Sequence, residues 1–470
     1  MTAAAQARPA GEGMVWASAR IAAYAAPEPL SARPVALADA LGTTLAAPLR
    51  AATPVPAFPS AAMDGYAVGP GGGPWRLVGR VLAGDAEASA VGPGEAAEIG
   101  TGAPTPAGTI AVLAYERATR SGDEIAGATE PGRHVRQVGE DVGLDVDLAR
   151  AGTVVTPTIL GLAAMVGLDD LPVRPRPRVA ALLTGTELVH SGQSGGGRVR
   201  DGVGPQLPGL VRWLGGELVL VRAVDDTPAD LLGAAVAETV AGAGPDVLLT
   251  VGGAGEGPAD RVRGALDRLG ARTLVAAVAC RPGHPQLLAR LPDGRWVVGL
   301  PGNPYAALVA ALTLLGPLLA GLAGRRLPTL PSARLLPPAG PGESAGLEPG
   351  TAPRPPAGPG GSAGLEPGTA HRPPAGPEPA AGPASAEIDP GAGSRPPVVS
   401  SPPAGSLRSA TAAEHLTRIV PVRRVRDNTV EPLGRDRPGN LWGAALADAL
   451  AVVRPGWQGE PVPLLALPPG

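Results

Sequence analysis

The sequence predicts a multidomain α/β and β protein, built around a doubly wound, mostly parallel α/β domain. After residue 177, short apolar runs alternate with helical stretches, which is typical of a parallel sheet covered by helices. Before that point, short apolar runs separated by glycines predict a small β domain. A Pro/Gly/Ala-rich repeat after residue 336 separates a last, strand-rich part from the rest of the chain.

Composition excludes several classes of partner. The 470 residues suffice for several hydrophobic cores, and the net charge of −3 predicts neither nucleic acid nor an anionic membrane as a partner. All 39 basic residues are arginine. The single cysteine, Cys280, rules out an internal disulfide and suits a reducing cytosol. A charged and then apolar signal sequence is absent from the N-terminus, so we expect a cytoplasmic protein.

Shifts in composition predict the domain limits. We expect a discontinuous N-terminal helical or mixed domain (15–50 and 134–176), a β domain (51–133), the α/β domain (177–326), a disordered insert (337–405) and a C-terminal β domain (406–470). In the N-terminal domain, helical spacing predicts helices over 15–26 and 36–49, and residues 156–166 form another apolar run. In the β domain, we expect strands at 75–81, 95–99 and 110–115.

The α/β domain shows a regular alternation. The predicted strands are 179–184, 217–221, 247–250, 273–279 and 296–300, and the predicted helices are 206–214, 229–240 and 261–269. The apolar run 308–323 contains Pro317 and is short for a membrane span, so it predicts a buried helix. We therefore expect no membrane partner.

The insert is a repeat of low complexity. Residues 337–354 recur almost unchanged as 355–372, with too few apolar side chains to offset the entropy of ordering them. After it, we expect a strand at 418–425 and a short helix at 441–450.

Glycines and acidic residues follow the predicted strands of the α/β domain. Gly252, Gly253 and Gly257 come after the strand 247–250, where bare backbone N–H groups can bind a phosphate. In doubly wound sheets the ligand lies outside the carboxyl ends of the strands. Further candidates at such ends are Glu187, Asp225, Asp260 and the run Pro301, Gly302 and Asn303, in which Asn303 can cap the next helix.

Seven motifs in order resemble one known family. They read SAAMDGYAV, GTGAPTPAG, RQVGEDV, TGTELV, GGAGEGPAD, RPGHP and LPGNP. Together they resemble a divergent member of the molybdenum insertases, the molybdopterin molybdenumtransferases of the MoeA and gephyrin E-domain type. The resemblance covers residues 15 to 325 and, weakly, 414 to 467.

The resemblance implies a reaction and its partners. Members of the family take adenylylated molybdopterin, supplied by an upstream adenylyltransferase, together with molybdate. They hydrolyse the adenylate with Mg²⁺, insert molybdenum into the dithiolene, and release AMP and molybdenum cofactor. The resemblance also implies an elongated homodimer, whose site lies between the α/β domain of one subunit and the β domain of the other.

The resemblance also assigns residues to roles. It places Asp64 and Thr101 of the β domain and the acidic Glu187, Asp225 and Asp260 in the catalytic set. Three carboxylates at neighbouring strand ends can share Mg²⁺, so the last three are the expected metal ligands. The expected cofactor-binding residues are Gly252, Gly253, Gly257, Arg281, His284, Pro301, Gly302 and Asn303. Asp141 matches a further aspartate, while Arg281 and His284 stand where the family usually has two lysines and can hold an oxyanion.

Each assignment has a structural alternative. Glu187, Asp225 and Asp260 also suit helix starts, Asp64 suits a turn before glycine, and His284 suits packing. A second function also stays open. The loop VGGAGEG lacks two hydroxyls of the family's SGGVSVG, which fits a catalytically weak paralogue that carries molybdopterin or molybdate. An unrelated phosphotransferase is disfavoured because GxxxxGK[ST] is missing.

Overall fold

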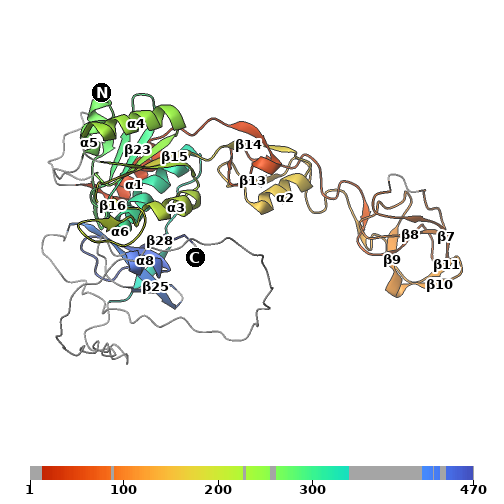
Figure 1. The fold of residues 1–470 in the computed structure, drawn as a ribbon. Helices are drawn as coiled ribbons and strands as arrows, with labels where there is room; N and C mark the ends of the chain where they lie inside the picture. Colours follow the sequence, from red (N-terminus) through yellow and green to blue (C-terminus); the bar gives the residue numbers. More distant parts are fainter. Residues whose placement is uncertain are drawn as a thin grey trace, which may run out of the picture.

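The molecule is elongated, with its described parts arranged in a row. The computed structural model describes residues 13–85, 89–225, 229–253, 261–337, 415–426, 428–433 and 441–468. An α/β unit and a C-terminal β unit lie together at one end, a small mixed unit follows, and a second β unit forms the other end (Figure 1). Most of the predicted disordered insert, together with Gly257 and Asp260, lies outside the described residues.

The central sheet of the α/β unit has six strands in the order β18-β15-β19-β23-β22-β20. The strands are β15 (Arg178–Thr184), β18 (Glu217–Val224), β19 (Val247–Val251), β20 (Arg272–Val275), β22 (Leu287–Arg290) and β23 (Trp296–Leu300). The first four in the sheet order are parallel, and β22 and β20 add antiparallel pairs at one edge. The predicted mostly parallel sheet is therefore confirmed, and its strand order reverses between β15 and β19.

Helices cover both faces of this sheet. They are α3 (Leu207–Trp213), α4 (Ala229–Ala243), α5 (Val262–Arg268), α6 (Pro304–Ala310) and α7 (Gly316–Leu322), with a π-helical turn η4 (Ala311–Leu315) between the last two. Alternate residues of β15 enter different cores: Ala181 and Leu183 face α3, α6 and α7, and Ala180 and Leu182 face α4 and α5. Such double burial is typical of parallel strands.

The apolar helix is a core element, as predicted. Residues Pro304–Leu322 are long and apolar enough to cross a membrane, but 94% of this window is buried inside the protein. Pro317 has no backbone N–H to donate to the preceding turn, but it does not end the helix. The π-helical turn directly before it changes the hydrogen-bond pattern at this point, so the helix continues. Helix α1 (Trp16–Ala25) packs on this stretch, where Trp16 Nε1 donates to Thr313 Oγ1 at 3.0 Å.

Two sequence predictions in the α/β part need correction. The single strand expected at 273–279 is wrong: β20 ends at Val275, and β21 (Val278–Arg281) belongs to the C-terminal sheet. Strand β22 was also missed. It forms a hairpin with β23 through the turn at Asp293 and Gly294, a pair of residues that favours hairpins.

The mixed unit contains short strands and one helix. They are β2 (Arg33–Ala36), β3 (Thr44–Leu45), β4 (Leu49–Arg50), β13 (Asp147–Ala149), β14 (Asp170–Arg174) and α2 (Pro157–Met165). The helix predicted at 36–49 is wrong. Only a 3₁₀ turn, η1 (Leu37–Asp39), forms there, because Gly42 adopts φ 76° and β14 pairs with both β2 and β3. Tertiary pairing overrides the helical spacing.

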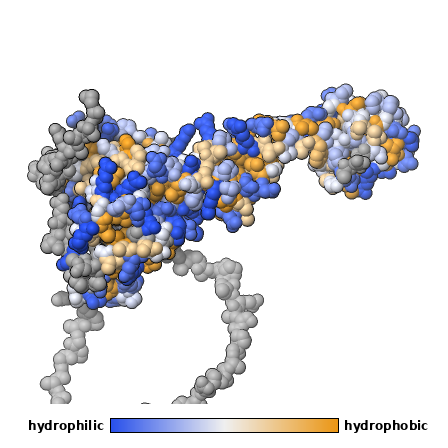
Figure 2. Space-filling model, turned by 90° about the horizontal axis from the view of Figure 1, so that it is seen from above, coloured by the Kyte–Doolittle hydropathy of each residue, from blue (hydrophilic) through white to orange (hydrophobic). Residues whose placement is uncertain are grey.

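The far β unit is a six-stranded sheet in the order β10-β11-β7-β8-β6-β9. Its strands are β6 (Gly65–Val68), β7 (Trp75–Val81), β8 (Glu95–Ile99), β9 (Ala111–Ala114), β10 (Thr119–Ser121) and β11 (Glu124–Ala126), with a 3₁₀ turn η2 (Tyr115–Arg117). The three strands predicted here are confirmed, to within one residue at each end. A short pair, β5 (Ser60–Ala61) and β12 (Val135–Arg136), marks the connection to the mixed unit. Figure 2 shows apolar residues along this connection.

The C-terminal unit is a small closed sheet. Its strands are β24 (Ser332–Leu335), β25 (Thr417–Arg426), β26 (Thr429–Pro432), β27 (Ala449–Val453) and β28 (Val462–Ala466), and β27 pairs back onto β25. Strands β1 (Met14–Val15) and β21 extend it. The predicted helix 441–450 is half right: α8 (Leu441–Ala445) stops early, because the following residues form the buried strand β27.

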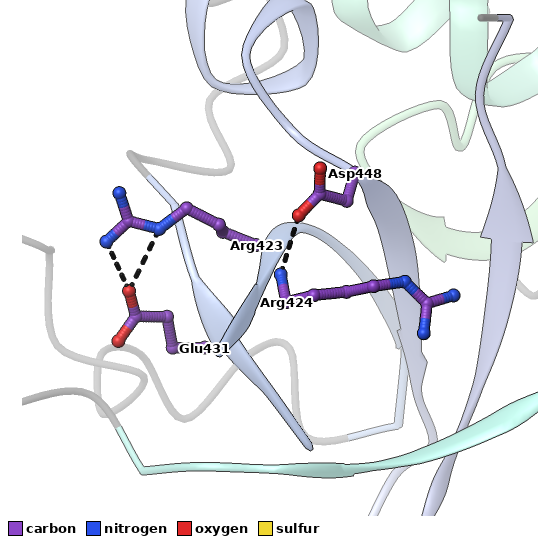
Figure 3. Close-up of polar contacts among 4 residues, drawn as sticks. All are labelled: Arg423, Arg424, Glu431 and Asp448. Carbon is purple, nitrogen blue, oxygen red and sulfur yellow. Dashed lines mark hydrogen bonds and ion pairs between the residues drawn. The ribbon is translucent and has the colours of Figure 1, made fainter. Parts of the chain in front are cut away.

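Polar contacts hold the turns of this sheet in place. Arg423 donates to Glu431 across the pair β25 and β26, and the Asp448 carboxylate accepts from the backbone N–H of Arg424 at 2.7 Å (Figure 3). The second contact joins the residue before β27 to the last part of β25.

Candidate functional site

The parallel strands β15, β19 and β23 end side by side at the point where the strand order reverses, and we call this edge of the sheet the crevice, after the place where such sheets bind ligands. Thr184, the last residue of β15, donates its hydroxyl to the Val251 carbonyl of β19 at 3.0 Å. The backbone N–H of Gly252 donates to the Leu300 carbonyl of β23 at 2.9 Å. These bonds hold the loops that follow β15, β19 and β23 together, at the edge where doubly wound proteins bind ligands.

Glycines open this crevice to a ligand. Gly252 and Gly253 adopt φ values of 88° and 62°, which disfavour other residues. A Cβ at Gly252 would lie 2.8 Å from both the carbonyl oxygen and the hydroxyl of Thr184. Gly302 also comes close, because a Cβ built there would lie 3.7 Å from the Cα of Gly252. The predicted Gly252 and Gly253 thus lie beside Gly302, with bare backbone between them, and Gly257 lies outside the described residues.

Two of the predicted acidic residues lie on adjacent strand ends. Glu187 follows β15 and folds back on Gly185, where a Cβ would lie 2.7 Å from its Oε2 atom. Asp225 follows β18, whose last residue Val224 pairs with Thr184. Both carboxylates are exposed, and neither forms an ion pair with any residue that the structure describes.

The predicted metal trio is incomplete in the described chain, because Asp260 lies outside it. Within the described ranges, the structure contains no group of three His, Cys, Asp or Glu residues arranged to hold a metal. The metal prediction therefore rests on Glu187 and Asp225 as its two described members.

The Arg281 and His284 loop closes another side of the crevice. It links β21 to β22, and a Cβ at Gly283 would lie 3.3 Å from the Ala306 carbonyl in the first turn of α6. Arg281 is exposed, whereas His284 is half-buried and its Nδ1 lies 2.8 Å from the Val278 carbonyl. One ring nitrogen of His284 is thus used to fix the loop.

The Pro301, Gly302 and Asn303 segment forms the floor next to that loop. Asn303 occupies the N-cap position of α6 and Pro304 its first turn, but the Asn303 side chain makes no capping hydrogen bond. The expected side-chain cap is therefore wrong. Asn303 is exposed, so its amide can contact a ligand.

A buried aspartate beside this floor escaped the sequence prediction. Asp201 is 8% exposed, and its Oδ1 accepts from the backbone N–H groups of Val203 and Gly204, both at 2.9 Å. Its Oδ2 lies 3.3 Å from the Nδ1 of His190. A Cβ at Gly202 would touch Pro304 at 2.9 Å, so this loop packs against the start of α6. The available signal was the sequence Asp-Gly, which favours such a turn.

The predicted residues of the β unit form a separate pair. The Oδ1 atom of Asp64 accepts from the backbone N–H of Thr101 at 2.6 Å and from its hydroxyl at 3.0 Å. These hydrogen bonds, the backbone one first, lower the pKa of Asp64 below its ordinary value. Asp141 lies on the connection and forms an ion pair with Arg136.

The two groups of predicted residues do not meet within one chain. Asp64 and Thr101 lie in the far β unit, and the crevice lies in the α/β unit at the opposite end of the molecule (Figure 1). One small ligand therefore does not contact both groups within a single copy of the chain.

Comparison with known proteins assigns the chain to a class and then to a family. Residues 15–167 match the MoeA N-terminal region (domain I and II), and residues 180–321 match the family described as a probable molybdopterin binding domain. The second match contains the whole crevice. The fold and the two matched regions are thus those of a molybdenum cofactor biosynthesis protein.

Comparison with individual relatives identifies the family within this class. The molybdopterin molybdenumtransferase of Synechococcus elongatus is 36% identical over 306 residues, which are 62% of this chain and 75% of that protein. Molybdopterin molybdenumtransferase 2 of Mycobacterium tuberculosis is 35% identical over 293 residues, 59% of this chain and 71% of that one. The chain belongs to the molybdopterin molybdenumtransferase family.

Solved structures show the same fold. Two crystal structures of the molybdopterin biosynthesis protein MoeA from Pyrococcus horikoshii superpose with TM-scores of 0.67 and 0.66, at 22% and 18% sequence identity. The alignments cover 98% and 97% of this chain and the full length of both structures.

Proposed function

We propose that this chain is a molybdopterin molybdenumtransferase that inserts molybdenum from molybdate into adenylylated molybdopterin and releases AMP. The observation that carries this proposal is the glycine-walled crevice at the strand switch point, within the region matching the molybdopterin-binding family. The bare backbone at Gly252 and Gly253 allows the phosphate groups of the adenylate to approach closely, and the backbone N–H of Gly253 can donate to them. The exposed Asn303 amide and Arg281 guanidinium add donors on two further sides of the crevice.

Glu187 and Asp225 fit a magnesium ion. They are exposed carboxylates on adjacent strand ends without competing ion pairs among the described residues, and Mg²⁺ uses one or two carboxylates together with substrate phosphate oxygens and waters. A bound Mg²⁺ would offset the negative charge that develops as the phosphoanhydride is cleaved. The protein's own part is to orient the adenylate on the glycine loop and to hold the leaving phosphate with donors.

Separation of the two residue groups supports a homodimer. The β unit of one copy would bring Asp64 and Thr101 to the crevice of the other. The connection between the units is also unusually apolar on its surface: Phe58, Val138 and Leu144 are 48%, 50% and 59% exposed. An exposed apolar stretch of this kind is typical of a surface that another protein covers.

A cytoplasmic location fits the single cysteine of the chain, which cannot form an internal disulfide. Cys280 is buried and unpaired, and burial raises its pKa to about 12, so the thiol is unreactive.

One experiment tests the proposed reaction. Purified protein is given adenylylated molybdopterin with Mg²⁺, with or without molybdate, and AMP release is measured. We expect AMP only when Mg²⁺ is present and faster release with molybdate. Tight binding of the adenylate with no AMP formed over hours would reject the enzyme and favour the carrier function instead.

A further inference from the structure

A second cavity lies at the other end of the parallel strands. It has a volume of about 490 Å³, within the range of small-molecule sites. It is lined by the end of α3, the middle of the Pro304–Leu322 helix, the loop 150–154, the segment 325–331 and the end of β28. Helix α3 and the Pro304–Leu322 helix start near the carboxyl ends of the strands and run back. The lining residues of these helices lie at the end of α3 and from Leu312 onward, so the cavity lies away from the crevice.

The lining of this cavity combines apolar walls with unbalanced positive charge. Trp213, Leu312, Pro317, Leu330 and Leu465 supply apolar surface. Four arginines also line it, and the lining contains neither Asp nor Glu. These arginines are Arg20, Arg150, Arg325 and Arg326.

Arg20 is the most unusual of the four. Its side chain belongs to a residue that is only 7% exposed, and it donates to the Leu312 carbonyl at 2.5 Å and lies 5.1 Å from the Trp16 ring. No carboxylate of the described chain pairs with it. Burial lowers its pKa to about 10, so it remains charged at neutral pH. A buried guanidinium without an anion is costly, because a carbonyl offsets only part of the lost hydration.

Arg325 lines the same cavity and, like Arg20, donates to a backbone carbonyl. Its Nη2 donates to the Leu214 carbonyl at 2.7 Å, and its Nε is buried without a hydrogen-bond partner. Gly215 makes room for it, since a Cβ there would lie 2.2 Å from the guanidinium. Arg150 and Arg326 are exposed at the rim and form no ion pair with described residues.

We propose that this cavity binds a small organic anion, made of an aromatic or branched apolar body that carries one carboxylate, sulfonate or phosphate group. The anionic group would lie among the arginines and the body against the apolar walls. A simple inorganic anion would leave those walls in contact with water, and a neutral ligand would leave the buried charges unbalanced. Such a site is separate from the crevice proposed to bind the adenylate.

The position of this cavity gives binding a measurable consequence. Its lining comes from the mixed unit through loop 150–154, from the α/β unit, and from the C-terminal sheet through β28. A ligand that contacts all three binds only when they are assembled, so it stabilises the folded chain.

Two dyes test the proposal on the full chain. Anilinonaphthalene sulfonate has an aromatic body with one sulfonate, and phenylnaphthylamine has the same body without the charge. We expect the sulfonate to bind one equivalent per chain with rising fluorescence and to raise the melting temperature. Phenylnaphthylamine should bind at least about tenfold more weakly, because it lacks the charge-assisted hydrogen bonds.

Substitutions locate the binding. Arg20→Met should weaken sulfonate binding about tenfold, and the exposed pair Arg150→Gln and Arg326→Gln several-fold, without changing phenylnaphthylamine. The matched control is Arg272→Gln, an exposed arginine of β20 outside the lining. If Arg20→Met does not fold, the exposed pair decides. Equal affinity of the wild type for both dyes, or sulfonate binding unchanged by the exposed pair, would overturn the proposal.

Discussion

Asp64 shows how much a single exposed side chain can be fixed without burial. Its carboxylate accepts two hydrogen bonds from Thr101, one from the backbone and one from the hydroxyl. The turn is therefore ordered even though the residue stabilises no core. An exposed and ordered carboxylate is suited to contact a ligand, while its removal leaves the packing intact.

We predict that Asp64→Asn lowers the rate of AMP release at least tenfold and changes the melting temperature little, because the residue is exposed. The matched control is Asp123→Asn, an exposed aspartate in the turn between β10 and β11. Steady-state AMP assays and thermal melts of both variants check this. A fully active Asp64→Asn enzyme would leave the residue as a turn former.

The hydrogen bonds to Asp64 also predict a pH effect. Its folded pKa lies below the ordinary value of 3.8, so the stabilisation is complete above pH ~3.8 and is lost as the pH falls through the lowered pKa. Thr101→Ala removes the hydroxyl but keeps the backbone N–H, so it should raise the pKa only part of the way. Carboxyl NMR titration of wild type and variant measures both values. Identical titrations would show that the hydroxyl contributes nothing.

Glu187 and Asp225 predict the magnesium dependence. Glu187→Gln and Asp225→Asn should each raise the Mg²⁺ concentration needed for half-maximal AMP release at least several-fold, because a neutral amide binds a hard cation more weakly. Glu217→Gln is the matched control, since this exposed residue starts β18, at the opposite end of the strand from Asp225. Mg²⁺ titrations of the three variants provide the measurement. An unchanged Mg²⁺ requirement in both site variants would remove the pair from the metal site.

At the scale of elements, the crevice depends on how the strand ends join. The loop after β19 bonds to β23, and the Thr184 hydroxyl at the end of β15 bonds to Val251. Gly252 lies between these two contacts. It needs a backbone conformation that disfavours other residues, and it has no room for a side chain. Function and local stability are linked at this position.

We predict that Gly252→Ala destabilises the protein by about 1–3 kcal/mol, because its φ of 88° is strained for alanine and the new Cβ meets Thr184. The variant should also lose adenylate affinity. Gly209→Ala is the control: it lies in α3 with open space around it, and should be neutral or stabilising by up to about 1 kcal/mol. Denaturant unfolding of both variants decides. Equal stabilities would mean that the loop shifts freely.

At the scale of the whole molecule, the elongated shape sets the distance between the two halves of the proposed site. The β unit stands apart from the α/β unit, with the mixed unit between them (Figure 1). The composite site that we propose between two copies fits this shape, and it can be tested without a structure of the dimer.

We predict that two impaired variants complement each other when AMP release is measured at a Mg²⁺ concentration that is limiting for Glu187→Gln. Asp64→Asn and Glu187→Gln subunits, unfolded and refolded together in equal amounts, should regain about one quarter of wild-type AMP release, because half of the dimers would carry one intact composite site. Each variant refolded alone should stay well below that level of activity. Sedimentation checks that both form dimers. Mixtures with no more activity than the separate variants would place both residues in a site of one chain.

The sequence by itself determined the elements with strong local signals. The alternation of apolar runs and helices defined the parallel sheet, and β7, β8 and β23 have the predicted limits. The long apolar run was correctly expected to be buried. Motif order indicated the family, which the relatives then established. The domain limits and the roles of the site residues stay predictions.

Tertiary structure decided what local pattern cannot encode. Residues 36–49 have helical spacing but pair with β14, and the run 273–279 divides between two sheets, because strand partners lie far away in the sequence. Arg20, Arg150 and the adjacent pair Arg325 and Arg326 come from distant segments, so only folding brings their charges around the second cavity. The sequence pattern predicts which face of a helix or strand is apolar. Only tertiary packing determines which residues contact that face and which groups lie near each charge.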